Sequence, residues 1–412
     1  MTLAPDLVRR RNSPGKIPTT SHLAPVNRAK RWPANCSRLT QAKRFPQGCF
    51  IMGQTVQASV HSGTPRTQLL SIQYLRAIAA LSVLVTHALQ WPLPEMNMYL
   101  LKTGRLGVEV FFVISGFIIT TIAGDGPFNP RVFLERRAHR IVPTYWAATF
   151  LVAVLAIALP NQFRTTVPTI EGLLKSMLFI PSLEPKAPLL LLGWTLNFEV
   201  FFYLMFASLF FLTSGLRTVV LLACFASLVG IGQFATGLSY VEAIYTSPSL
   251  IGFGLGMILA QAYRLGWITW LGEYLRWPVV AAPLCLLLAF YVIGWDSADS
   301  ILLWKHLLMS FCALSIGLLA LHCETQNKVA DLKLPRYLGD ASYSIYLFHI
   351  FAVAGVWAIA KRIFDVQHPL IYAMGAALAM LAGLVFGLLC HHYIERPLLA
   401  AGTKRSRTVP AT

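Results

Sequence analysis

The sequence predicts an all-α, polytopic membrane protein with about ten transmembrane helices and cytoplasmic N- and C-termini. Three observations predict this fold class. Hydrophobic residues make up 56% of the 412 residues, whereas charged residues make up only 12%, about half the share in an ordinary soluble domain. Ten apolar segments are long enough to cross a bilayer. The basic residues are concentrated in the connections on one side of these segments.

Residues 1–66 are expected to form a disordered basic arm. They contain eleven Lys and Arg residues against a single acidic residue, Asp6, together with many Ser, Thr and Pro. Such a composition cannot bury a core. One hypothesis is that translation starts at Met52, which would make the residues upstream of it an artefact. After the arm we expect one transmembrane domain, residues 70–398, and a disordered cytoplasmic tail, residues 399–412.

The predicted membrane segments follow the arm in close succession. The segments 217–235 and 248–264 are the weakest predictions because they are rich in Gly and small residues, which suit close helix packing in lipid. The outer connection 161–192 contains four prolines and a short apolar patch, so we expect a re-entrant or interfacial segment lining an opening on the outer face. The ten segments lie near residues 71–90, 105–123, 141–160, 193–213, 217–235, 248–264, 277–294, 303–321, 340–360 and 370–391.

The distribution of charge indicates a plasma-membrane (inner-membrane) protein rather than a nucleic-acid-binding one. With the N-terminus in the cytoplasm, the cytoplasmic side receives about three times as many Lys and Arg residues as the outer side. The net charge of +17 is thus distributed as expected for a membrane protein, which argues against nucleic-acid binding. The seven cysteines show no paired spacing typical of a metal site, and we interpret them as small buried hydrophobes. We expect no metal cofactor.

The first apolar segment contains two ionisable residues, Arg76 and His87. They are 11 residues apart and would lie on one helix face, about 16 Å apart along the axis. Ionisable residues inside a membrane are functional candidates. The alternative is that Arg76 reaches the inner interface and His87 the outer one.

Two carboxylates are expected at the depth of His87 in the outer half of the membrane. Glu109 lies near the outer end of the second segment and Glu199 near the outer end of the fourth, with Trp194 and Asn197 just outside it. A carboxylate beside a histidine fixes its tautomer and raises its basicity, as a general base requires. The alternative is that each group contacts the outer lipid headgroups.

A basic cluster opens the third segment. Arg136 and Arg140 would share one helix face, as would Arg137 and Arg140, and Arg131 and His139 lie nearby. Such a cluster can bind the phosphates of an acyl-CoA or a nucleotide bidentately. The alternative is an anchor on anionic lipid.

The ninth segment adds further polar candidates. Ser342 and Tyr343 lie near its inner end, and His349 near mid-membrane. A histidine at that depth indicates either a polar path or a hydrogen-bonded core residue. The group His391, His392 and Glu395 is interpreted as an interfacial boundary.

Six motifs, taken in order, resemble the acyltransferase-3 family of integral-membrane acyltransferases. They are YLRAIAALSVLVTHA, GVEVFFVISGFII, FLERRAHRIVPTYW, WTLNFEVFFYL, LGDASYSIYLFHIF and YIERPL. The resemblance covers residues 70–398, and the WTLNFEVFFY form is most similar to the branch associated with exopolysaccharide and nodulation-factor acetylation. Many relatives have a second acid after the position of Glu199, where this chain has Val200.

The resemblance implies transfer of an acyl group, usually acetyl, from cytoplasmic acetyl-CoA to a hydroxyl of an exopolysaccharide or another cell-surface carbohydrate precursor. The acceptor would be a carbohydrate or a lipid-linked saccharide. In the family's motifs, Arg76 and His87 form an Arg-x10-His element, and Arg137 and Arg140 form an arginine pair, although Arg136 leaves the pairing open. On this expectation the arginines bind the donor, and His87 acts as base or transient acyl carrier, oriented by Glu199 or Glu109. The competing hypothesis is a transporter or flippase that uses Arg76, His87 and Glu199 as a relay.

Overall fold

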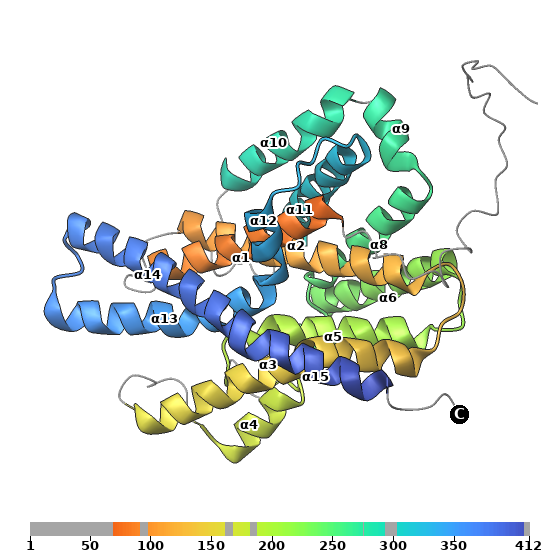
Figure 1. Ribbon diagram of the computed structural model, residues 1–412. Coiled ribbons are helices and arrows are strands. Elements are labelled where there is room, and N and C mark those ends of the chain that lie inside the picture. Colours follow the sequence, from red (N-terminus) through yellow and green to blue (C-terminus); the bar gives the residue numbers. More distant parts are fainter. Residues whose placement is uncertain are drawn as a thin grey trace, which may run out of the picture. The chain divides into compact units, whose positions relative to one another are not determined.

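The computed structural model describes residues 69–90, 98–160, 168–181, 188–274, 276–292 and 303–407, and no β-strand is present among them. The predicted arm lies outside these residues. Of the predicted tail, residues 399–407 are described and are helical, and residues 408–412 lie outside. The helices, shown in Figure 1, are α1 Leu70–Gln90, α2 Met98–Ala123, α3 Pro130–Ala158, α4 Ile170–Met177, α5 Gly193–Ser208, α6 Ser214–Phe234, α7 Tyr240–Tyr245, α8 Leu250–Arg264, α9 Trp267–Tyr274, α10 Arg276–Val292, α11 Leu303–Thr325, α12 Lys333–Asp340, α13 Ser342–Ile363, α14 Pro369–Cys390, the π-helical turn η3 His391–Glu395, and α15 Arg396–Arg407.

The all-helical membrane fold predicted from the sequence is confirmed. Within the described residues, eight helical stretches are long and apolar enough to cross a membrane. The other two predicted segments correspond to α5 and α10, which have 16 and 17 residues.

Helix α3 includes the basic residues Arg131, Arg136, Arg137 and Arg140, because Asn129 caps the helix and Pro130 starts it. We call the end of the bundle where α1 begins, α2 ends and α3 begins the basic end.

Helix α14 shows how the bundle separates its packed surface from its lipid-facing surface. Large side chains at intervals of three or four residues, including Leu370, Met374, Leu378 and Leu381, are exposed. The opposite face has buried small residues, among them Gly383 and Gly387. In lipid, large apolar side chains face outward at no cost and small residues allow helices to approach closely. This face of α14 therefore packs along α13 (Figure 1).

Helices α2 and α8 cross closely at glycines. A Cβ on Gly116 would collide with the carbonyl oxygen of Phe253, and one on Gly256 with that of Val113. Backbone cannot move aside as a side chain can, so only glycine fits at these two positions. The expectation that the small residues of segment 248–264 suit close helix packing is confirmed at Gly256.

Helix α1 contacts α2, α11, α12, α13 and α14 and is held at both ends. At its start, the Glu324 carboxylate of α11 accepts hydrogen bonds from the backbone N–H groups of Leu70 and Ser71, at 3.2 and 2.7 Å. At its end, Trp357 Nε1 donates to the Ala88 carbonyl at 2.9 Å, and the Tyr372 hydroxyl to the Leu89 carbonyl at 2.7 Å. These side chains satisfy backbone groups that a helix leaves unpaired at its ends, so the position of α1 relative to α13 and α14 is fixed.

Helix α5 begins inside the bundle because of the segment before it. Helix α4 packs against α3 about midway along its length, where the Tyr145 hydroxyl is 2.9 Å from Ser176 Oγ and Trp146 Nε1 donates to the Met177 carbonyl at 2.9 Å. The chain thus returns alongside α3 before α5 starts at Gly193, which packs on Tyr145. The expected re-entrant or interfacial arrangement of this segment stays a prediction.

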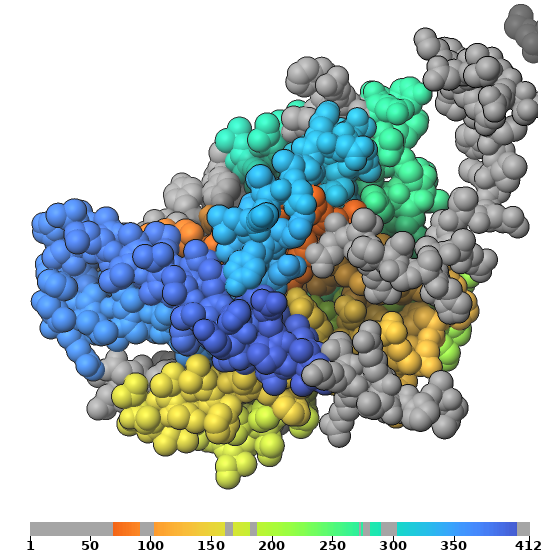
Figure 2. Space-filling view, viewed as in Figure 1, coloured from red at the N-terminus to blue at the C-terminus, as the bar shows by residue number. Residues whose placement is uncertain are grey.

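Helix α15 returns over the basic end. It continues the chain from η3 and packs against α3. Figure 2 shows its residues in dark blue against the yellow and gold residues of α3. Helix α15 therefore brings Arg396 to the same end of the bundle as the α3 arginines.

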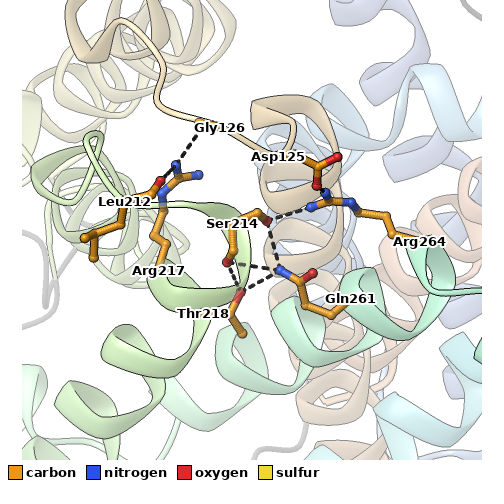
Figure 3. A network of polar contacts seen from close by, with 8 residues as sticks. All are labelled: Asp125, Gly126, Leu212, Ser214, Arg217, Thr218, Gln261 and Arg264. Carbon is orange, nitrogen blue, oxygen red and sulfur yellow. Dashed lines mark hydrogen bonds and ion pairs between the residues drawn. The ribbon is translucent and has the colours of Figure 1, made fainter. Parts of the chain in front are cut away.

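A polar network joins the α2–α3 connection to the start of α6 and the end of α8 (Figure 3). Arg217 is buried between the rings of Phe128 and Phe206, and its guanidinium donates to the carbonyls of Leu209, Gly126 and Leu212 at 3.2, 3.1 and 2.6 Å. Beside it, Arg264 forms an ion pair with Asp125. A buried cation is tolerated here because backbone oxygens and aromatic faces replace its hydration.

Replacing Arg217 by Leu should lower the free energy of unfolding by about 2–3 kcal/mol, because three carbonyl oxygens lose a charged donor. Equilibrium unfolding in mixed detergent micelles measures this loss. The matched control is Asp125→Ala, which removes a largely exposed carboxylate from the same network and should cost at most about 1 kcal/mol. Equal losses in the two variants would contradict the structural role of Arg217.

Candidate functional site

A cavity of about 590 Å³ lies at the basic end of the bundle. Apolar residues of α2, α3 and α5 form part of its wall, and its polar lining comes from seven helices and η3. This concentration of polar side chains inside an apolar bundle makes the cavity the candidate binding site. The polar lining residues are Gln73, Arg76, Ser115, Arg137, Arg140, Thr195, Glu199, Tyr203, Tyr337, Asp340, Ser342, Tyr343, Tyr346, His391 and Arg396.

The cavity brings together three of the predicted arginines, Arg76, Arg137 and Arg140. Arg76 Nη1 donates to Gln73 Oε1 at 3.2 Å, and Arg137 has a buried Nε without a hydrogen-bond partner. Arg136 is exposed and lines a smaller hollow of about 160 Å³ that shares Arg137 with the main cavity. Of the two pairings that the sequence leaves open, only Arg137 with Arg140 faces the main cavity.

Glu395 is a site residue that the sequence reasoning missed. Its carboxylate is fully buried, 3.3 Å from Arg140 Nη1, and it accepts hydrogen bonds from Ser344 Oγ at 2.7 Å and His391 Nδ1 at 2.8 Å. The π-helical turn η3 brings His391 and Glu395 onto one side, and such turns are frequent at functional sites. The interpretation of these two residues as an interfacial boundary is wrong, whereas His392 is exposed. The spacing of His391 and Glu395 by four residues was the signal available in the sequence.

Glu199 lines the main cavity together with Arg76, Arg137 and Arg140, and we call this cavity the arginine cavity. Glu199 is not hydrogen-bonded to His87. Its Oε1 accepts hydrogen bonds from the Tyr203 hydroxyl at 2.5 Å and from Ser115 Oγ at 3.2 Å. The prediction that Glu199 lies at the same membrane depth as His87 assumed that α5 begins at the outer surface. Because α5 begins inside the bundle, Glu199 lies deeper and closer to the basic end than the hydropathy pattern indicates.

His87 is paired with His349. His349 Nε2 is 3.1 Å from His87 Nδ1, and the two ring centroids are 5.1 Å apart. His349 is fully buried and His87 partly buried. The predicted base thus has a second imidazole as its side-chain partner, in place of the expected carboxylate.

The cavity ends about one helical turn before this histidine pair. Tyr346, which lines the cavity, precedes His349 by three residues on α13, and neither histidine contributes to the lining. The rings of Phe111 and Tyr346 meet edge to face at 5.9 Å, and the Tyr346 hydroxyl is 2.8 Å from Thr195 Oγ1. Both Phe111 and Tyr346 line the cavity.

The remaining predicted residues are divided between the cavity and other surroundings. Ser342 and Tyr343 line the cavity, and the Tyr343 hydroxyl donates to the Ile141 carbonyl at 2.9 Å. Glu109 is buried elsewhere, where Ser310 Oγ donates to its Oε1 at 2.5 Å.

Trp194 and Asn197 do not line the cavity either. The Arg105 guanidinium lies 5.9 Å from the centre of the Trp194 ring, and Asn197 is buried. Among the described residues, no group of three or more His, Cys, Asp or Glu side chains is placed to hold a metal ion.

Comparison with known proteins gives a family match. A family model described as "Acyltransferase domain" matches residues 69–391. The exopolysaccharide production protein ExoZ of Rhizobium meliloti (strain 1021) is 36% identical over 324 residues, which cover 74% of this chain and 92% of ExoZ. No solved structure is significantly similar to the chain.

Two further relatives are more distant. Acyltransferase MdmB of Streptomyces mycarofaciens is 27% identical over 375 residues, which cover 80% of this chain and 91% of MdmB. O-acetyltransferase OatA of Staphylococcus aureus (strain NCTC 8325 / PS 47) is 25% identical over 317 residues, which cover 67% of this chain. The match spans only 49% of OatA.

Proposed function

This chain belongs to the acyltransferase-3 family and is a membrane O-acyltransferase, and on that premise we propose that it transfers acetyl from acetyl-CoA to a hydroxyl of an exopolysaccharide or another cell-surface carbohydrate precursor. The observation that carries the proposal is a cavity with three inward-facing arginines, separated by about one helical turn from a buried imidazole pair. The name of ExoZ supports a carbohydrate acceptor.

The arginine cavity would bind the donor. Arg76, Arg137 and Arg140 supply planar donors that match phosphate oxygens bidentately. Glu395 already pairs with Arg140, which leaves Arg137, with its unpartnered Nε, as the main candidate for a phosphate contact. In this proposal the phosphates stay at the basic end while the pantetheine arm extends along the cavity toward Tyr346.

The histidine pair would act on the acceptor. His87 either takes the proton of the carbohydrate hydroxyl as that oxygen attacks the thioester, or accepts the acetyl group and passes it on. In the direct route the C–S bond breaks as the C–O ester bond forms, and the proton goes from the hydroxyl to His87 and then to the leaving thiolate. Because neither histidine lines the cavity, this proposal requires side chains between the cavity and His87 to move so that the thioester can reach it.

The deciding experiment uses the purified protein in lipid nanodiscs or vesicles with radiolabelled acetyl-CoA and chemically de-O-acetylated exopolysaccharide fragments. Ester-linked label on the fragments supports the proposed acetyl transfer. Carbohydrate uptake into vesicles without ester formation would contradict it and select the transporter hypothesis.

Replacing His87 by Ala should reduce acetyl transfer by roughly 100-fold or more, because a positioned base contributes about 10²–10⁴ in rate. Transfer of label measured under saturating donor checks this. The control is His392→Ala, which removes an exposed histidine of η3 and should leave the rate within about twofold. A His87→Ala protein that is folded in the membrane and equally active would refute the assigned role.

Replacing Arg137 by Ala should raise the KM for acetyl-CoA about 10–100-fold, since a charge-assisted hydrogen bond is worth about 1.5–3 kcal/mol. The neighbouring Arg136→Ala removes the same charge from an exposed position outside the main cavity and should change KM at most about threefold. Initial rates over a range of acetyl-CoA concentrations distinguish the two. Equal effects would indicate that the cluster acts as a lipid anchor.

A further inference from the structure

We infer that His349 is a positioning residue that fixes the tautomer of His87, so that Nε2 of His87 is the nitrogen that accepts the proton from the hydroxyl. The inference rests on the proposed function, and it gives His349 a role different from the expected polar path. It depends on three contacts that together determine where the ring hydrogens lie.

The first contact determines the tautomer of His349. Its Nδ1 is 2.8 Å from the carbonyl oxygen of Ile345, one turn back on α13. A carbonyl oxygen can only accept a hydrogen bond, so this Nδ1 carries a hydrogen. A neutral imidazole has one N–H group, and Nε2 of His349 is therefore an acceptor.

The other two contacts determine the tautomer of His87. Its Nδ1 lies 3.0 Å from the Val83 carbonyl oxygen and 3.1 Å from Nε2 of His349. Both neighbours are acceptors, so a hydrogen on Nδ1 is attracted by both, whereas a bare Nδ1 would place three lone pairs together. The hydrogen therefore belongs on Nδ1, and Nε2 of His87 is left unprotonated, as a general base requires.

The carboxylates expected to orient His87 are engaged elsewhere. Glu199 accepts from Tyr203 and Ser115, and Glu109 accepts from Ser310. Among the described residues, no carboxylate oxygen is hydrogen-bonded to either imidazole. The orienting role that a carboxylate has in many catalytic histidine pairs thus falls to His349.

The backbone around the pair holds this geometry. Trp357 of α13 donates to the Ala88 carbonyl, next to His87, which ties the end of α1 to α13. On α14, Gly383 lies against His349, where an added Cβ would be 3.4 Å from His349 Cβ and 2.6 Å from Leu84 Cδ1. The distance between the rings is therefore set by the packing of α1, α13 and α14.

The same two contacts of His87 Nδ1 also stabilise the state in which His87 is protonated. When Nε2 of His87 takes the hydroxyl proton, the ring becomes positively charged, and its Nδ1–H remains directed at two acceptors, the Val83 carbonyl and His349 Nε2. Both acceptors stabilise that charge without themselves taking a proton. The proton on Nε2 then goes to the thiolate that leaves, and the pair returns to its starting state.

The test compares two substitutions at one position in the full-length protein in lipid nanodiscs. His349→Gln retains an acceptor near the place of Nε2, whereas His349→Leu has similar volume and no acceptor. With radiolabelled acetyl-CoA and de-O-acetylated exopolysaccharide fragments, His349→Leu should lower kcat roughly 100-fold while KM for acetyl-CoA stays within about threefold. His349→Gln should remain within about tenfold of the unsubstituted protein.

Solid-state nitrogen NMR of histidine-labelled protein provides a readout independent of activity. The unsubstituted protein should show His87, assigned by its loss in His87→Gln, with hydrogen on Nδ1 alone. In His349→Leu the Val83 carbonyl is the one acceptor left of the two that face Nδ1, so the share of the tautomer with hydrogen on Nε2 should increase measurably. An unchanged kcat in His349→Leu, or equal losses in both variants, would overturn the inference. Absence of any transfer by the unsubstituted protein would count against the proposed function, and the NMR spectrum would still decide the tautomer.

Discussion

Charged side chains buried in this bundle are stabilised by partners inside the protein, because the surrounding lipid offers none. Arg217 is stabilised by three backbone carbonyls and two aromatic faces. Glu395 is stabilised by Arg140, Ser344 and His391. These contacts join helices distant in sequence, so satisfying a buried charge also fixes the relative positions of the helices that form the cavity.

Helix α1 connects the two parts of the proposed site. Arg76 lines the arginine cavity near one end of the helix, and His87 meets His349 near the other. Side chains of α11, α13 and α14 satisfy the unpaired backbone groups at both ends of α1. Because α1 is held in this way, the proposed donor site and the proposed base keep a constant separation.

Some of the site could be predicted from residue spacing alone. Arg137 and Arg140 are three residues apart, and a helix places such residues on one face, so both arginines reach the cavity. The depth of Glu199 could not be predicted in this way. Its depth depends on where α5 begins. The packing of α4 and Gly193 against Tyr145 sets that position, and it cannot be inferred from the hydropathy of α5.

The sequence by itself determined the helical membrane class, the arginine face of α3 and the family, because hydropathy, helical spacing and motif order are local properties of the chain. Only the tertiary structure decided that Glu395 pairs with Arg140, that Glu199 belongs to the arginine cavity, and that His349 is the partner of His87. The physical reason is that a hydrogen-bond partner depends on which helices are neighbours and at what depth they meet. Close packing of small residues and buried polar contacts between distant segments set both, and neither can be inferred from the pattern within one segment.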